Sequence, residues 1–170
     1  PTPPLNIPSS FPVKEETEYK LDTFNNYIFL REGGTLYLFD NNPETFEKIL
    51  EGVKDIKISP DKNKLAIFSD SEIWIFYLKD KPEMPIKKTG ERQFLTRLSE
   101  KINNVFWLNN DYLILSTGDK IKITEIDDRD RVQTWEIDNF PNPQIFFNNT
   151  DKKLYILSEG IMSTSVKLNY

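Results

Sequence analysis

Apolar residues occur along the chain in short bursts that come in pairs. Each pair consists of two bursts separated by a short connection, and the four pairs lie at 27–30 and 36–39, 65–68 and 73–76, 112–115 and 121–123, and 154–157 and 162–168. The connections contain Gly, Asp or Ser, as in Gly33-Gly34 and Gly118-Asp119. Short apolar runs joined in this way are typical of β-hairpins. The pattern therefore predicts four hairpins.

The hairpins are evenly distributed. Their first bursts begin at positions 27, 65, 112 and 154, which are 38, 47 and 42 residues apart. A period of about 40–45 residues is typical of the blades of β-propellers. The last three hairpins are each preceded by a further apolar strand that ends in a turn rich in Pro, Asn and Asp; these strands are 53–58, 105–107 and 145–147.

A fourth element follows each of the first three hairpins, and its type is ambiguous. Residues 42–51 are compatible with a helix that has Asn at its N-cap and Pro at its first position, and the segment 94–98 also permits a helical face. Residues 132–137, in contrast, are rich in β-formers and alternate along the segment. Because equivalent places in repeats should adopt one state, the sequence predicts strands at all three places.

These elements predict an all-β, β-propeller-like domain over residues 21–170, with about four blades of antiparallel four-stranded sheets. The last repeat lacks its fourth strand. Residues 1–20 contain five prolines in the first twelve positions, so we expect a linker, or an edge segment that closes the ring by pairing with the last sheet. A complete four-bladed ring and part of a larger ring both remain possible.

Composition narrows the range of functions. The 170 residues include 22 aromatic ones but no Cys and no His, which excludes disulfides, Cys-rich zinc sites and His-dependent catalytic triads within this chain. The formal net charge of -5 argues against a nucleic-acid partner. No apolar run reaches the ~20 residues of a membrane helix, and no cofactor or metal is expected.

One turn and two longer stretches resemble known propeller repeats. Ser59-Pro60-Asp61-Lys62 resembles the SPDG turn of TolB-type and WD40-like repeats, with Lys62 where that turn often has Gly. Residues 53–78 and 105–131 are similar to β-propeller regions of proteins that also carry PEGA domains in small-genome candidate-phyla bacteria. The resemblance covers about residues 21–168, and this chain lacks a PEGA domain.

The resemblance implies a non-catalytic, extracytoplasmic module at the cell surface, within a parent protein that is anchored in a membrane. No catalytic motif accompanies the resemblance. We therefore expect partners that are proteins or cell-envelope polymers.

The longest insertion runs from 78 to 92 and is locally basic. Long loops on a rigid scaffold often carry binding residues, and this one would favour an anionic partner. Its candidate binding residues are Lys79, Lys81, Lys87 and Lys88. The alternative is a flexible, solvated spacer.

A second candidate connection contains Asp127, Asp128, Arg129 and Asp130. Carboxylates at short spacing can bind Ca²⁺, but the Gly and terminal Glu of an EF-hand loop are missing. A solvated turn between strands is the alternative, and no metal site is assigned. We include the four residues as candidate partner-binding residues.

The three tryptophans, Trp74, Trp107 and Trp135, lie inside strand patterns. Indole rings in propeller blades usually pack between sheets, so we expect these in the core; the alternative is a rim that stacks on sugars.

Three functions remain open. The first is a non-enzymatic scaffold whose loops bind proteins or surface polymers. The second is a carbohydrate-active hydrolase, which needs two carboxylates about 5–10 Å apart in one pocket. The third is a self-assembling module in which open blade edges form a homo-oligomer.

Overall fold

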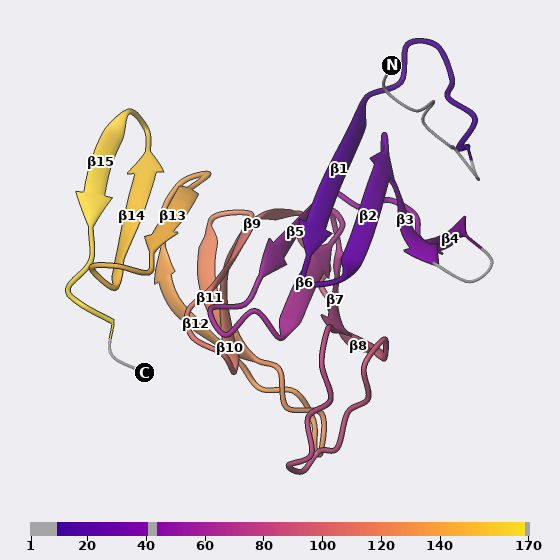
Figure 1. Cartoon of the computed structure of the whole chain (residues 1–170). Coiled ribbons are helices and arrows are strands. Elements are labelled where there is room, and N and C mark those ends of the chain that lie inside the picture. The colour runs from indigo at the N-terminus through magenta and orange to yellow at the C-terminus, as the bar shows by residue number, and fades with distance from the viewer. Residues whose placement is uncertain (1–9, 41–43, 169–170) are drawn as a thin grey trace. The chain divides into compact units, whose positions relative to one another are not determined.

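The structure is a computed structural model that describes residues 10–40 and 44–168 (Figure 1). Every regular element in this part of the chain is a β-strand, and the strands form four antiparallel sheets. Each sheet is built from strands that are consecutive in the sequence. The prediction of an all-β fold made of four repeated sheets is therefore confirmed.

The first three sheets have four strands each. The first contains β1 (Tyr19–Phe24), β2 (Tyr27–Glu32), β3 (Thr35–Asp40) and β4 (Thr45–Leu50). The second contains β5 (Asp55–Ile58), β6 (Lys64–Phe68), β7 (Glu72–Tyr77) and β8 (Arg92–Arg97). The third contains β9 (Ile102–Trp107), β10 (Tyr112–Thr117), β11 (Lys120–Glu125) and β12 (Thr134–Asn139).

The last sheet has three strands, as the sequence predicted for the final repeat. These are β13 (Gln144–Asn148), β14 (Lys153–Ser158) and β15 (Ile161–Thr164). The ambiguous fourth elements are the strands β4, β8 and β12, so the interpretation as strands is confirmed. Asn42 and Pro43, which suggested a helix start, lie outside the described residues.

The chain divides into two compact units, residues 1–53 and 54–170, which are described separately. In the first unit, Phe29 and Leu36 are fully buried, and Phe11 packs its ring edge-on against Tyr37 at 5.0 Å between centroids. Lys14 forms an ion pair with Glu32 at 3.1 Å. Residues 10–18 therefore contact the sheet of their own unit.

The sequence did not predict β1, whose first residues, Tyr19 and Lys20, were assigned to the Pro-rich segment. Tyr19, Leu21 and Thr23 alternate with charged or aromatic residues, which is a weak strand signal. Residues 1–9 lie outside the described part of the chain. Ring closure by the N-terminal segment therefore stays a prediction.

In the second unit, three sheets follow one another in a stack (Figure 1), with two apolar cores between them. One core lies between the β5–β8 and β9–β12 sheets and includes Ile75, Trp107 and Leu115. The other lies between the β9–β12 and β13–β15 sheets and includes Ile114 and Phe147. Stacked antiparallel sheets of this kind are the arrangement of propeller blades.

Burial explains which strands read as continuous apolar runs. Five of the six residues of β10 are buried, because neighbouring sheets cover both faces of this strand, and all five residues of β6 are buried as well. Strand β13, nearer the end of the stack, alternates between exposed and buried residues. All six residues of β12 are exposed.

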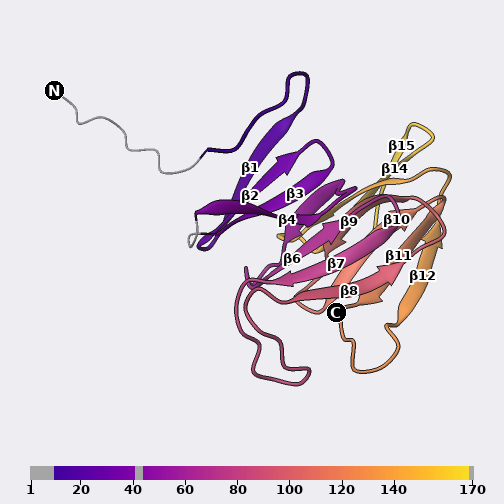
Figure 2. The same cartoon turned by 90° about the vertical axis from the view of Figure 1, so that its right-hand side faces the viewer.

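Strand order also decides where the connections lie. In a four-stranded antiparallel sheet with sequential order, the first and third connections leave from the same end. The β7–β8 and β11–β12 loops, residues 78–91 and 126–133, therefore extend from one end of the second unit, together with the β5–β6 and β9–β10 turns (Figures 1 and 2).

No helix in the described residues is long and apolar enough to cross a membrane.

Candidate functional site

The turn at residues 59–64, which joins β5 to β6, is organised around one carboxylate. The Asp61 carboxylate accepts hydrogen bonds from the Ser59 hydroxyl at 2.5 Å, the backbone N–H of Asn63 at 3.0 Å and the Lys64 ammonium at 3.1 Å. The Ser59 oxygen accepts a further bond from the Lys64 amide at 2.9 Å. Ser, Pro and Asp are residues that favour turns, and these hydrogen bonds stabilise the turn that they form here.

This turn also contacts the next sheet, because the Asp61 amide donates to Asn110 Oδ1 at 3.0 Å. Burial tends to raise the pKa of Asp61. The hydrogen bonds from Ser59, Asn63 and Lys64 outweigh burial and hold that pKa below its ordinary value. Asp61 therefore stays ionised at neutral pH.

Lys62 stands where related turns often have Gly, and the structure shows the consequence. Its φ is 59°, in the left-handed region that favours glycine. Lys152 has φ 60° in the corresponding turn between β13 and β14. Each lysine directly follows an Asp, and the carboxylate of that Asp accepts a hydrogen bond from the backbone N–H two residues after the Asp. The two turns are therefore equivalent.

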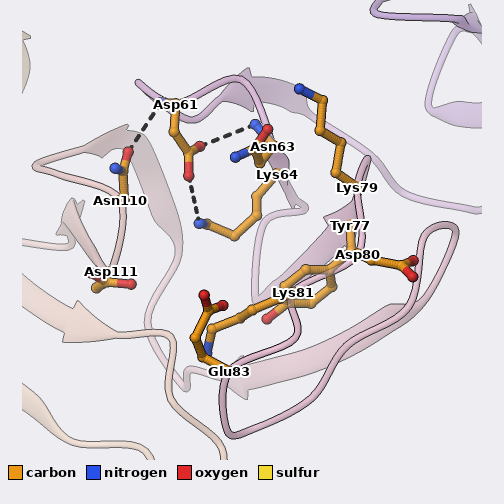
Figure 3. A pocket seen from close by; sticks show the side chains of 10 residues that line it. All are labelled: Asp61, Asn63, Lys64, Tyr77, Lys79, Asp80, Lys81, Glu83, Asn110 and Asp111. Atoms are coloured by element: carbon orange, nitrogen blue, oxygen red, sulfur yellow. Dashed lines mark hydrogen bonds and ion pairs between the residues drawn. The ribbon is translucent and has the colours of Figure 1, made fainter.

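A polar pocket of about 260 Å³ opens beside this turn (Figure 3). Its walls come from the β5–β6 turn, the start of the 78–91 loop and the β9–β10 turn. The lining residues are Asp61, Asn63, Lys64, Tyr77, Lys79, Asp80, Lys81, Glu83, Asn110 and Asp111. Asn63 lines this pocket, and its buried Oδ1 has no hydrogen-bond partner among the residues that the structure describes.

A second hollow of about 260 Å³ shares four of these residues and extends toward the 126–133 loop. The shared residues are Lys64, Tyr77, Lys81 and Asp111, and the second hollow adds Pro85, Tyr112, Glu125, Ile126 and Asp127. Lys81, which belongs to the 78–91 loop, lines both hollows and therefore lies near the 126–133 loop as well. Together we call the two hollows the loop-end pocket.

Lys87 joins the two loops. Its ammonium, in a residue that is only 7% exposed, pairs with Asp128 at 2.6 Å and Glu91 at 3.1 Å. It also lies 5.9 Å from the centre of the Tyr77 ring, within reach of a cation–π interaction. Burial tends to lower the pKa of Lys87, but the bonds to Asp128 and Glu91 outweigh it and raise the pKa overall.

A second contact, made by uncharged groups, connects the ends of β7 and β8 to the 126–133 loop. The Tyr77 hydroxyl donates to Gln93 at 2.7 Å, and the Gln93 amide donates to the Ile126 carbonyl at 2.7 Å. Burial, followed by the nearby Asp128 carboxylate, raises the pKa of Tyr77 far enough to keep the phenol neutral. With Lys87, this link fixes the base of both loops.

The predicted site residues lie in several different surroundings. Lys79 and Lys81 line the loop-end pocket, whereas the buried Lys87 pairs with Asp128 at the surface. Lys88 is exposed, and its ammonium lies 3.5 Å from the Asp80 carboxylate. Most of the 78–92 segment is exposed, but Lys87 is buried, and Lys81 and Lys87 form a β-bridge across the loop. A role as a flexible, solvated spacer stays a prediction.

The carboxylates of the acidic connection, residues 127–130, have different partners. Asp127 pairs with Arg129 at 2.5 Å, and this contact holds the pKa of Asp127 below its ordinary value. Asp128 is taken by Lys87, and Asp130 is exposed. Within residues 10–40 and 44–168, no group of three or more carboxylates is placed to hold a metal ion.

Sequence reasoning missed the turn residues of the pocket, which are Asp61, Asn63, Asn110 and Asp111. The signal was present, since all four lie in the polar turns that separate predicted strands.

The tryptophans follow the prediction only in part. Trp107 is 2% exposed, and its indole donates to the Lys57 carbonyl at 2.8 Å. Trp135 is 46% exposed, so the core assignment is wrong there.

Comparison with known proteins supports the fold. Neither a family model nor a curated protein sequence matches the chain. A chain in the Chaetomium thermophilum Nup82 NTD–Nup159 TAIL–Nup145N APD complex matches with TM-score 0.63 and 12% identity, over 88% of this chain and 42% of that chain. The Cps50 (Swd1) β-propeller domain of Myceliophteria thermophila matches with TM-score 0.59 and 14% identity, over 88% and 53%.

A candidate 6-phosphogluconolactonase of Bacteroides fragilis is also similar, with TM-score 0.56 and 11% identity over 92% of this chain and 56% of that chain. The chain therefore spans about half the length of the solved structures that it matches. Identities this low concern the fold alone. The sheet order and these similarities together show that the chain has a β-propeller fold.

Proposed function

We propose that this chain is a non-catalytic scaffold that binds a protein partner at the loop-end pocket. The observation that carries the proposal is the position of Lys79 and Lys81. Both lysines line the pocket, and the loop from which they extend is fixed at its base by the Lys87–Asp128 pair. A recognition surface on a rigid base loses little entropy when a partner binds.

The first hollow of the loop-end pocket suits a polar group from a partner better than an apolar small molecule. Seven of the ten residues that line this hollow are charged, and its volume of about 260 Å³ falls below the range of about 300–1,000 Å³ typical of small-molecule sites. Lys79 and Lys81 extend in different directions (Figure 3), so each ammonium group would meet a separate carboxylate of a partner. The similar Nup82 structure is a complex of several proteins, which agrees with a scaffold role.

The cellular setting is part of the proposal and rests on the resemblance described above. We propose that the parent protein is membrane-anchored and presents this module outside the cytoplasm, near proteins or envelope polymers. Protease treatment of intact cells tests this: digestion of the module before the cells are lysed supports an outside location. Digestion only after lysis contradicts it.

A hydrolase remains the second candidate, because the pocket contains the carboxylates of Asp61, Asp80, Glu83 and Asp111. A glycosidase needs one carboxyl that stays protonated, with a raised pKa. Instead, hydrogen bonds from Thr89 lower the pKa of Asp80, and the bonds to Asp61 lower that of Asp61. Turnover of chromogenic glycosides that is lost in Glu83→Gln or Asp111→Asn would favour the hydrolase instead.

The binding proposal is tested by reversing charge in the pocket. The double variant Lys79→Glu/Lys81→Glu is compared with Lys153→Glu/Lys167→Glu, which makes the same change in net charge on the last sheet and the segment after it. Quantitative capture from envelope and cytosolic extracts should yield proteins that the wild type and the control retain and the pocket variant loses. Equal capture by all three would contradict the proposal.

A further inference from the structure

Strand β12 carries apolar side chains on an open edge. It pairs with β11 on one side only, and all six of its residues are exposed. Trp135 is 46% exposed and Ile137 is 40% exposed. Natural proteins usually protect edge strands with charges, prolines or a covering segment, since an exposed edge offers unpaired backbone groups to another chain.

The apolar residues of β12 line a hollow. It has a volume of about 300 Å³ and is lined by Tyr112, Ile123, Trp135 and Ile137. Trp135 lies directly opposite Ile123 in the ladder, and its ring lies 6.3 Å from that of Tyr112. We call this the β12 groove. It lies on the sheet face whose inner part packs against the last sheet.

The equivalent positions one sheet earlier are covered. Both β8 and β12 have a bulge at the same place in their ladders, which aligns Gln93 with Trp135 and Leu95 with Ile137. Gln93 and Leu95 are each only 5% exposed.

The cover over β8 comes from the next sheet's loop. Gln93 bonds to the Ile126 carbonyl, and Ile126 and Val132 belong to the core that contains Leu95. The described part of the last sheet has three strands and leaves Trp135 and Ile137 exposed. The β12 groove is thus an uncovered copy of a surface that is covered elsewhere in the same molecule.

Charges around the groove indicate which occupant fits it. Glu125 lies opposite Tyr112 in the ladder, and Asp138 lies opposite Ile121. Of the six acidic residues in 125–139, Asp127, Asp128 and Glu136 pair with Arg129, Lys87 and Lys120, so the carboxylates that the ladder places beside the groove are those of Glu125 and Asp138. An acidic rim around an apolar hollow is complementary to a basic segment that carries a bulky apolar residue.

We propose that the β12 groove binds an extended, basic peptide segment of a partner protein, with one large apolar side chain anchored against Trp135. The segment adds to the β12 edge through main-chain hydrogen bonds, as in β-augmentation. Its lysine or arginine side chains face Glu125 and Asp138. This site adjoins the loop-end pocket, with which it shares Tyr112 and Glu125, and it selects the opposite charge.

The test uses a fluorescein-labelled octapeptide of alternating lysine and valine with a central leucine. We expect saturable binding by fluorescence anisotropy that weakens as salt rises, and a blue shift in tryptophan emission as Trp135 is covered. Trp135→Ala should weaken binding at least tenfold, which corresponds to about 1.4 kcal/mol for a central anchor. Glu125→Gln and Asp138→Asn should each weaken it severalfold.

Matched variants make the result decisive. Phe94 on β8 is also 46% exposed, so Phe94→Ala removes an equally exposed aromatic ring and should leave binding unchanged. Lys79→Glu/Lys81→Glu should bind the peptide at least as well as the wild type, which separates this site from the loop-end pocket.

Three results would overturn the proposal. One is equal affinity of Trp135→Ala and the wild type for the peptide. Another is equal binding of a peptide with glutamate in place of lysine. The third is a concentration-dependent dimer in analytical ultracentrifugation that Trp135→Ala abolishes and the peptide does not displace, because the occupant would then be a second copy of this chain.

Discussion

At the scale of single residues, Asp61 links local turn structure to the packing of sheets. Its carboxylate accepts three hydrogen bonds within its own turn, and its amide bonds to Asn110 of the next sheet. A short polar turn thereby positions one wall of the loop-end pocket. The side chain contributes as an anion, so its effect on stability depends on pH.

Asp61→Asn should lower the free energy of unfolding at pH 7 by about 1–2 kcal/mol, the cost of weakened charge-assisted hydrogen bonds. The folded-state pKa of Asp61 lies below its ordinary value of 3.8, so its contribution is complete well above pH 3.8 and is lost as the pH falls through the folded value. Urea unfolding between pH 7 and pH 2.5 should show the two proteins converging. A constant difference across that range would contradict the role of the anion.

Lys62 gives a second prediction, from its φ of 59°. Lys62→Gly should change the free energy of unfolding by less than about 1 kcal/mol, since relief of strain is offset by the greater freedom of glycine in the unfolded chain. Lys62→Val should destabilise by about 1–2 kcal/mol, because a β-branched residue fits this conformation poorly. Thermal unfolding of both variants tests this. Equal melting temperatures for Lys62→Gly and Lys62→Val would be evidence against a left-handed backbone conformation at this position.

At the scale of elements, the fourth strand of each four-stranded sheet is attached in the same way. The ladders of β3 with β4, β7 with β8 and β11 with β12 all shift register after Leu36, Ile73 and Ile121. These three residues are fully buried. The common bulge shows that the three sheets are equivalent units, which sequence spacing alone could only suggest.

The 78–91 and 126–133 loops should be energetically coupled through Lys87 and Asp128. A double-mutant cycle with Lys87→Met and Asp128→Asn should give a coupling energy of about 1 kcal/mol, larger than for most surface pairs because Lys87 is buried. Urea unfolding of the four proteins measures it. An additive cycle would mean that the two loops are independent.

At the scale of the whole molecule, the repeat pattern predicted the architecture well, because hairpin spacing and strand composition depend on local sequence. Strand β1 was missed, since its side chains are mostly exposed or half-buried and carry little apolar signal. The sequence placed Lys79 and Asp127 in candidate loops, but it could not show that Lys87 and Asp128 pair across 41 residues. Trp135 was misassigned because nothing local indicates whether a neighbouring segment covers a strand.

Because the sheet that contains β10 lies between two others, we expect side chains on both faces of β10 to contribute similarly to the free energy of unfolding. Ile114 and Leu115 face the two different cores, and both are fully buried. Ile114→Ala and Leu115→Ala should each destabilise by about 2–4 kcal/mol, whereas Ile137→Ala on exposed β12 should cost less than about 1 kcal/mol. Chemical denaturation tests this. A mild effect at either β10 position would show that one face of the sheet is not covered.

The most direct test of the central claim, that the loop-end pocket is the partner-binding surface, is quantitative lysine acetylation read by mass spectrometry, with and without a captured partner. The account predicts that Lys79 and Lys81 lose reactivity in the complex, while Lys153 and Lys167 label equally in both states. Unchanged labelling of Lys79 and Lys81 in the presence of bound partner would contradict it.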